Sequence, residues 1–337
     1  MIVVLKPKAS RAQIEAVIKE VRKLGYKPHP ITGVERTVIA AIGDERTHHT
    51  LETLTAMAAV DQVMPVQRRF KLVSREVNPK GSTVTVNGHV FGGRKFQVIA
   101  GPCSVESQRQ LLDAARAVKK AGATFLRGGA FKPRTSPYEF QGLKEEGLKL
   151  LAEARAETGL GIVTEVLSEA DVGLVAEYAD ILQIGARNSQ NFALLIAAAQ
   201  TGKPILLKRG MSMKIEEWFL SAEYILSHGN PNVILCERGI RTFETMTRNT
   251  LDLGAVALAK VETHLPVVVD PSQGAGRADL VSALSKASVA TGCDGLLIEV
   301  HPNPKEALSD GAQQVTPQQF SKLMTDLKPF LRAAGRN

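Results

Sequence analysis

Cysteine and aromatic residues are scarce in this chain of 337 residues, and each scarcity excludes a class of protein. The three cysteines, Cys103, Cys236 and Cys293, are too few for the disulfide framework of a secreted domain. We therefore expect a reducing, cytoplasmic environment. Aromatic residues make up 5% of the chain, and no nucleic-acid-binding motif accompanies the net charge of +8. The positive charge thus favours small anionic substrates over nucleic acid.

Long apolar runs are also absent from the sequence. No stretch approaches the roughly 20 apolar residues that span a bilayer, and the N-terminus lacks a signal-peptide pattern. We expect no membrane partner. The hydrophobic fraction of 44% is ordinary for a globular protein. The length allows one large domain and one small one.

Residues 1–66 are predicted to form the small domain. Strand and helix patterns alternate in it, at 2–5 (strand), 12–24 (helix), around His29 (strand), 38–42 (strand), 51–57 (helix) and 60–66 (strand). The order βαββαβ is that of a ferredoxin-like fold. Such a domain either holds a small effector where copies pair or serves oligomerisation alone, and the sequence leaves both interpretations open.

Residues 67–95 are predicted to be a connector that contains a β-hairpin. Asn87-Gly88 is the pair that two-residue hairpin turns favour, and it lies between two short β-rich runs. We expect this hairpin to cover the bottom of the domain that follows.

Residues 96–337 show alternating strand and helix patterns. Eight apolar strand cores are recognisable, at 98–100, 123–126, 162–163, 181–184, 205–207, 233–235, 267–269 and 296–298. Eight strands, each followed by a helical stretch, over about 240 residues predict an α/β fold of the (β/α)8 TIM-barrel type. A doubly wound open sheet is the alternative.

Polar residues just past the strand cores favour a closed barrel. They are Cys103, Arg127, Glu165, Arg187, Lys208, Arg238, Gln273 and Glu299. Barrel enzymes build their sites on one rim from the ends of several strands. Structural salt bridges explain a few such residues more readily than all eight. The segment Leu126–Pro137, LRGGAFKPRTSP, adds three cations on a glycine-containing loop, which suits phosphate or carboxylate groups.

Seven segments resemble the 3-deoxy-D-arabino-heptulosonate 7-phosphate (DAHP) synthase family, in its type Iβ form with an N-terminal ferredoxin-like regulatory domain. They are Ala100–Glu106, Leu126–Pro137, Gln183–Arg187, Leu206–Gly210, Leu235–Gly239, Val269–Ser272 and Ile298–Pro302. The resemblance covers nearly the whole chain. It implies condensation of phosphoenolpyruvate with erythrose 4-phosphate and water to give DAHP and phosphate, the first step of the shikimate pathway.

The resemblance also implies roles for individual residues. Phosphoenolpyruvate would be held by Arg127, Lys132, Arg187, Lys208 and Arg238. Erythrose 4-phosphate would be held by Pro133, Arg134, Thr135 and Ser136. Lys132 would also deliver a proton and Glu165 would position water.

The family's metal ligands fall on Cys103, Gln273, Glu299 and Asp310. Such a donor set suits a divalent manganese, iron, zinc or cobalt ion, and Cys103 would serve catalysis through it. The family has a histidine where this chain has Gln273. The chain is then a natural variant with a weaker ligand, an engineered variant, or a protein that binds substrate without catalysis. We favour a working enzyme because the other site residues are present. His301 is a less favoured substitute ligand, since the family has histidine there too.

Two alternative functions remain open. The first is 3-deoxy-D-manno-octulosonate 8-phosphate synthase, whose members share the barrel but normally lack the N-terminal domain and the KPRTS form of the loop. The second is a non-catalytic phosphoenolpyruvate-binding homologue. The resemblance further implies a homotetramer and an aromatic amino acid effector bound near His29. Because relatives can place a hydroxyl where this chain has Ile31, we expect weak or altered inhibition by tyrosine.

Overall fold

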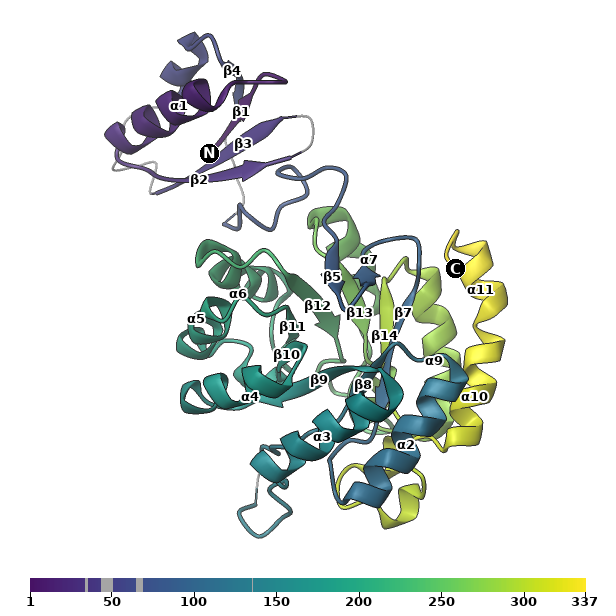
Figure 1. Ribbon diagram of the computed structural model, residues 1–337. Helices are drawn as coiled ribbons and strands as arrows, with labels where there is room; N and C mark the ends of the chain where they lie inside the picture. The colour runs from purple at the N-terminus through teal and green to yellow at the C-terminus, as the bar shows by residue number, and fades with distance from the viewer. Residues whose placement is uncertain (34–35, 44–50, 65–68, 135) are drawn as a thin grey trace. The chain divides into compact units, whose positions relative to one another are not determined.

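The computed structural model describes residues 1–337 except 34–35, 44–50, 65–68 and 135. The chain divides into two compact units, Met1–Gly81 and Ser82–Asn337 (Figure 1). This division differs from the expected boundaries, because the connector predicted at 67–95 is not a separate part. Val77 packs on the sheet of the first unit, whereas the hairpin after Gly81 belongs to the core of the second.

The first unit contains a four-stranded antiparallel sheet in the order β2-β3-β1-β4. Its strands are β1 (Ile2–Leu5), β2 (Lys27–Thr32), β3 (Thr37–Ile42) and β4 (Val60–Met64). The helix α1 (Arg11–Lys23) follows β1 and begins with a capping box, in which Ser10 and Gln13 bond each other's backbone N–H groups. The topology confirms the ferredoxin-like prediction.

The second helical segment of this unit is the 3-10 helix η1 (Leu51–Ala56) rather than the expected α-helix over 51–57. Leu51 and Leu54 are buried in it. Their spacing of three matches the three residues per turn of a 3-10 helix, so both leucines lie on the same side of it and pack into the core.

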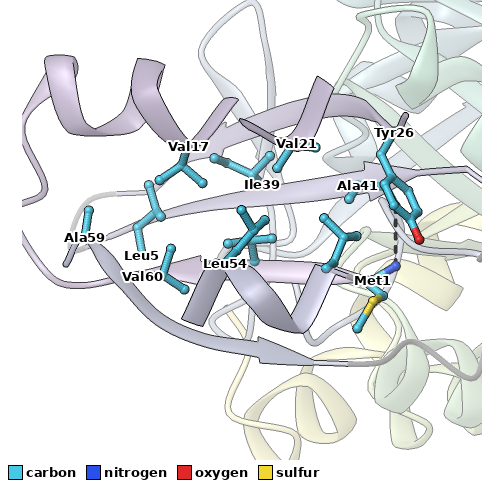
Figure 2. Packing of buried hydrophobic residues seen from close by; sticks show 12 residues of the cluster. Met1, Leu5, Val17, Val21, Tyr26, Ile39, Ala41, Leu54, Ala59 and Val60 are labelled. Carbon is cyan, nitrogen blue, oxygen red and sulfur yellow. Dashed lines mark hydrogen bonds between the residues drawn. The ribbon is translucent and has the colours of Figure 1, made fainter. Parts of the chain in front are cut away.

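Both faces of the sheet are covered by apolar side chains. On one face Val17 and Val21 of α1 pack with Leu5, Ile39 and Leu54 (Figure 2). A second cluster joins residues of all four strands to the segment before Gly81; it comprises Ile2, Val4, Val38 and Val77, with Ile31 and Met64 at its edge. The segment before Gly81 therefore completes the first unit.

The second unit is a closed parallel barrel in the order β10-β11-β12-β13-β14-β7-β8-β9. Its strands are β7 (Gln97–Gly101), β8 (Phe125–Arg127), β9 (Gly161–Val166), β10 (Ile181–Ile184), β11 (Ile205–Lys208), β12 (Val233–Glu237), β13 (Val267–Val269) and β14 (Gly295–Glu299). The first and last strands close the ring, with Gln97 opposite Gly295 and Ile99 opposite Leu297. The (β/α)8 prediction is confirmed, and the open sheet was the wrong alternative.

Helices surround the barrel strands (Figure 1). They are α2 (Gln108–Ala121), α3 (Glu145–Thr158), α4 (Val172–Tyr178), α5 (Phe192–Gln200), α6 (Ile215–Ser227), α7 (Leu253–Glu262), α8 (Pro271–Ala275), α9 (Ala278–Ala290), α10 (Pro317–Asp326) and α11 (Lys328–Ala333). Among the described residues of this unit, the connections also contain the 3-10 helices η2 (Glu169–Asp171), η3 (Ala186–Asn188), η4 (Pro304–Glu306) and η5 (Gly311–Gln313). Among the described residues, no helix has the length and apolar character needed to cross a membrane.

The hairpin of β5 (Val84–Val86) and β6 (His89–Phe91) fills one end of the barrel. Asn87 and Gly88 both have positive φ, 49° and 78°, as a two-residue type I′ turn requires. Phe91 lies 5.1 Å from the ring of Phe125, the first residue of β8. The hairpin thus covers the amino-terminal end of the barrel, as predicted, and leaves the carboxyl-terminal rim for a site.

Candidate active site

A cavity of 390 Å³ lies at the carboxyl ends of the barrel strands, and cations dominate its lining. The basic residues are Lys132, Arg134, Arg187, Lys208, Arg238, Arg241 and Arg248, and the acidic ones are Glu139, Glu165 and Asp310. Because like charges gathered in a cleft raise the local potential, seven cations against three carboxylates favour a ligand with several negative charges.

Lys208 and Arg238 lie deep in this cavity, on neighbouring strands. Lys208 ends β11, and Arg238 directly follows β12, whose Cys236 is paired with Lys208. Only 1% of Lys208 is exposed, and its Nζ donates to Oδ2 of Asp270 at 2.6 Å. Burial lowers the pKa of Arg238. The barrel register therefore brings two cations together where water is scarce.

Arg127 lies buried beside the same site with one donor unpaired. Its Nη1 donates to Oε1 of Glu299 at 2.7 Å, and the residue is 3% exposed. Its Nε has no hydrogen-bond partner among the described residues. A buried unpaired donor costs roughly 1–3 kcal/mol, so this nitrogen favours an acceptor brought by a ligand.

Lys132 reaches back from the loop after β8 to Cys103. Its Nζ lies 3.1 Å from both the carbonyl oxygen and Sγ of Cys103. Gly129 permits this approach, since a Cβ there would lie 2.8 Å from Cδ of Lys132. Burial opposes the charge of Lys132, but Cys103 and nearby carboxylates outweigh it and raise the lysine pKa. Lys132 is therefore a charged group at the base of the cavity.

Cys103, Glu299 and Asp310 form a group whose donor atoms all lie within 4.8 Å of one another. Sγ of Cys103 is 3.4 Å from Oδ2 of Asp310, and Arg248 donates to the other oxygen of Asp310 at 2.9 Å. Burial, and then Glu299, raise the pKa of the Cys103 thiol. Burial would raise the pKa of Asp310, but Arg248 and Lys132 lower it. One thiol and two carboxyls fit the divalent ion that the resemblance implies.

Gln273 lines the cavity on the side of the deep cations. Its Oε1 accepts from Nζ of Lys208 at 3.3 Å and from Nε of Arg238 at 3.4 Å. The carboxamide oxygen is thus engaged by two cations.

The other predicted site residues are distributed unevenly. Glu165, Arg187, Pro133 and Arg134 line the cavity, and Nε of Arg134 donates to Oε2 of Glu139 at 2.8 Å. Ser136 is not part of the lining; its Oγ accepts from the N–H of Tyr138. Thr135 lies outside the described residues.

Sequence reasoning missed the basic residues of the long loop after β12. Arg241, Arg248 and Asn249 line the cavity, and Asn249 donates to the carbonyl of Gln273 at 2.8 Å. The available signal was the pair of arginines between Arg238 and α7.

The first unit contains a second cavity, of 770 Å³. Ile31, Val38 and Met64 contribute apolar walls, and Arg36 and Lys80 contribute charge. His29, the predicted effector residue, is half-buried in β2 and is not part of this lining. Burial, and then the neighbouring Lys27, lower the pKa of His29.

Comparison with known proteins gives consistent matches to both units. Residues 79–332 match the DAHP synthetase I family, and residues 1–68 match the DAHP synthase ferredoxin-like domain. The chain is 49% identical to phospho-2-dehydro-3-deoxyheptonate aldolase of Thermotoga maritima, over 99% of each chain. A crystal structure of phospho-2-dehydro-3-deoxyheptonate aldolase (DAHP synthase) from that organism has a TM-score of 0.80 at 48% identity, covering 100% of this chain and 98% of that one.

A more distant relative is 2-dehydro-3-deoxyphosphooctonate aldolase of Methylobacterium radiotolerans. It is 33% identical over 77% of this chain and 98% of its own length. The similarity to this second group is thus lower and leaves a larger part of the chain unmatched.

Proposed function

Because the chain belongs to the DAHP synthetase I family, we propose that it condenses phosphoenolpyruvate with erythrose 4-phosphate and water, giving DAHP and inorganic phosphate in the shikimate pathway. The observation that carries this proposal is the cationic cavity on the barrel rim, with Cys103, Glu299 and Asp310 gathered beside it. The ferredoxin-like first unit adds support.

Phosphoenolpyruvate would occupy the deep end of the cavity. Its phosphate and carboxylate together need several donors, and arginine forks bind both groups in bidentate fashion. Arg127 offers an unpaired Nε, and the buried cations of this end are Lys132, Lys208 and Arg238. Arg187 lines the same cavity as an exposed residue. Erythrose 4-phosphate would lie nearer the mouth, against Pro133 and Arg134. Thr135 and Ser136 stay predictions from the sequence.

A divalent ion, when bound, would supply Lewis acidity toward the aldehyde oxygen. Cys103, Glu299 and Asp310 would hold it, and Gln273 was predicted as the fourth ligand. Lys132 is charged and lies 3.1 Å from Sγ of Cys103, so it would hold the proton that the new hydroxyl requires. Glu165, which lines the cavity and lies 3.4 Å from Nε2 of Gln183, would orient the water.

The function is tested by measuring phosphate release from the purified full-length chain. Release should require phosphoenolpyruvate, an aldose phosphate and a divalent ion together, and erythrose 4-phosphate should be preferred over arabinose 5-phosphate. Preference for arabinose 5-phosphate would favour the octulosonate reaction. Binding of phosphoenolpyruvate with no release under any metal would favour the non-catalytic homologue.

This chain retains the thiol and the two carboxyls that would bind the metal, so we expect its reaction to depend on a bound ion. Removal of that ion should abolish the reaction. Dialysis against a strong chelator should reduce phosphate release to background, and stoichiometric Mn²⁺, Zn²⁺, Fe²⁺ or Co²⁺ should restore it. Full activity of protein shown by elemental analysis to be metal-free would contradict this prediction.

Regulation would reside in the first unit. We propose that an aromatic amino acid binds there and that the chain forms a homotetramer. Ile31 lines the cavity of 770 Å³ in this unit. An apolar side chain cannot satisfy a phenolic hydroxyl, and an unpaired polar group costs roughly 1–3 kcal/mol. Tyrosine inhibition is therefore expected to be weak.

A further inference from the structure

Gln273 stands where the resemblance places a metal-binding histidine, yet its side chain contacts two cations. Its Oε1 accepts from Nζ of Lys208 and from Nε of Arg238. Lysine and arginine only donate hydrogen bonds, so the carboxamide must present its oxygen to both. The Nε2 group, which only donates, can serve neither cation.

The backbone of Gln273 is held on both sides of this side chain. Its N–H donates to Oδ1 of Asp270 at 2.9 Å, and its carbonyl accepts from Asn249 at 2.8 Å. Oδ2 of Asp270 accepts from Lys208. Asp270, Lys208 and Gln273 thus form a closed set of contacts that Arg238 joins through the amide oxygen. A rotation of the side chain would break the contacts to both cations.

A neutral acceptor suits a site that must stay positive. Lys208 and Arg238 are 1% and 4% exposed, so water offers their charges little screening. Asp270 already offsets the charge of Lys208, so a second carboxylate at position 273 would offset that of Arg238 as well. An amide oxygen accepts from both cations and leaves the charge of Arg238 for an anionic substrate. A neutral imidazole has one acceptor nitrogen and cannot accept from both cations at once with good geometry.

We propose that Gln273 is a positioning residue that holds Lys208 and Arg238 in place for phosphoenolpyruvate, and that the side-chain metal ligands are Cys103, Glu299 and Asp310. The proposal rests on the proposed function, since it assigns phosphoenolpyruvate to this cavity. Two groups on the same rim would then have different roles. The neutral amide would position the cations that bind substrate, and the thiol and carboxyls would bind the metal.

The test measures two affinities on the full-length chain. Phosphoenolpyruvate binding is titrated calorimetrically on metal-free protein, and Mn²⁺ and Zn²⁺ affinities are measured by competition with a chromogenic chelator. Gln273→Ala should weaken phosphoenolpyruvate binding about tenfold and change metal affinity by no more than about twofold. Gln273→Asn, which withdraws the oxygen by one methylene, should act in the same direction and replaces the alanine variant if that one misfolds. Gln318→Ala, an exposed glutamine of α10, is the matched control.

A loss of affinity confined to phosphoenolpyruvate supports the proposal. A fall in metal affinity, alone or together with the substrate effect, overturns it, because Gln273 is then a ligand. No change in either affinity overturns it as well. If the unaltered chain itself fails to bind phosphoenolpyruvate, the proposed function fails instead, and this is seen before any variant is compared.

Discussion

Arg187 offers the cleanest single-residue test of the substrate cavity. It lines the cavity, whereas Arg127 is paired with buried Glu299 and its removal would also leave a buried carboxylate uncompensated. A charge-assisted hydrogen bond contributes about 1.5–3 kcal/mol, so Arg187→Ala should weaken phosphoenolpyruvate binding roughly tenfold to hundredfold.

Calorimetric titration of phosphoenolpyruvate checks the Arg187 prediction. Arg187→Lys should lose less than the alanine variant, because it keeps the charge and gives up only the planar fork. Arg109→Ala, on the exposed face of α2, is the control for loss of an arginine. Equal affinity in Arg187→Ala and the unaltered chain would place Arg187 outside the binding site.

At the scale of elements, a buried ion pair between Arg209 and Glu237 links the carboxyl ends of β11 and β12. Arg209 directly follows Lys208, and Glu237 directly precedes Arg238, so the two pairs alternate along neighbouring strands. Nη1 of Arg209 donates to Glu237 at 3.1 Å and to Asp252 at 2.9 Å. The Oε1 atom of Glu237 accepts from the N–H of Gly239 at 2.6 Å. The pair therefore joins the two strand ends that carry the deep cations.

Breaking this pair from one side should destabilise the barrel. Glu237→Leu removes the fully buried partner of Arg209 and leaves the guanidinium with the partly exposed Asp252 alone, so it is expected to cost about 3 kcal/mol. The double variant Arg209→Met/Glu237→Leu should cost less than the single one, because no under-paired buried guanidinium remains and Asp252 can be solvated. Calorimetric unfolding of both variants measures this difference. A double variant less stable than Glu237→Leu would show that the ion pair is not the reason for the loss.

The sequence predicted elements best where apolar periodicity was long. The eight barrel strands, α1 and the hairpin at Asn87-Gly88 fall where their patterns indicated. The barrel strands are buried along most of their length and so form continuous apolar runs, whereas α1 buries one side at helical spacing. The segment 51–57 misled because Leu51 and Leu54 fit a 3-10 helix as well as an α-helix. The sequence also assigned the rim residues to strand ends, because strand ends share one edge in any parallel barrel.

The partners of rim side chains could not be read from the sequence. Whether Gln273 faces the thiol or the deep cations depends on contacts among β11, the loop after β12 and α8, which no local pattern encodes. Arg248 was missed for the same reason: its contact with Asp310 joins residues far apart in the chain. Long loops carry no periodicity, so their contribution to a cavity appears only after folding.

At the scale of the whole molecule, the division after Gly81 predicts separable activities. A chain starting at Ser82 should keep the condensation activity and lose any response to aromatic amino acids. The barrel unit has its own closed sheet and its own buried core, so it is expected to fold without the first unit. A start at Gln67 should behave worse, because Val77 would lose the sheet that it packs against.

Initial rates with and without phenylalanine, tyrosine and tryptophan check the truncation, with the full-length chain as control. Equal effector sensitivity in both chains would refute a regulatory role of the first unit. Strong tyrosine inhibition of the full-length chain would refute the argument from Ile31.

Because β7 pairs with β14, the barrel can close only after the ribosome has made nearly the whole chain. Gln97 pairs with Gly295, and Ile99 pairs with Leu297, so β7 lacks one neighbouring strand until β14 has been synthesised. A ribosome adds roughly 5–20 residues per second, so the first barrel strand stays without its last neighbour for on the order of ten seconds or more. An apolar strand with an unpaired edge is prone to join other chains during that time. The early hairpin, whose strands are adjacent in sequence, can form within microseconds and then shelters the amino ends of the strands as they arrive. Lower expression temperature or added chaperones should therefore reduce aggregation during this interval, which precedes formation of the substrate site.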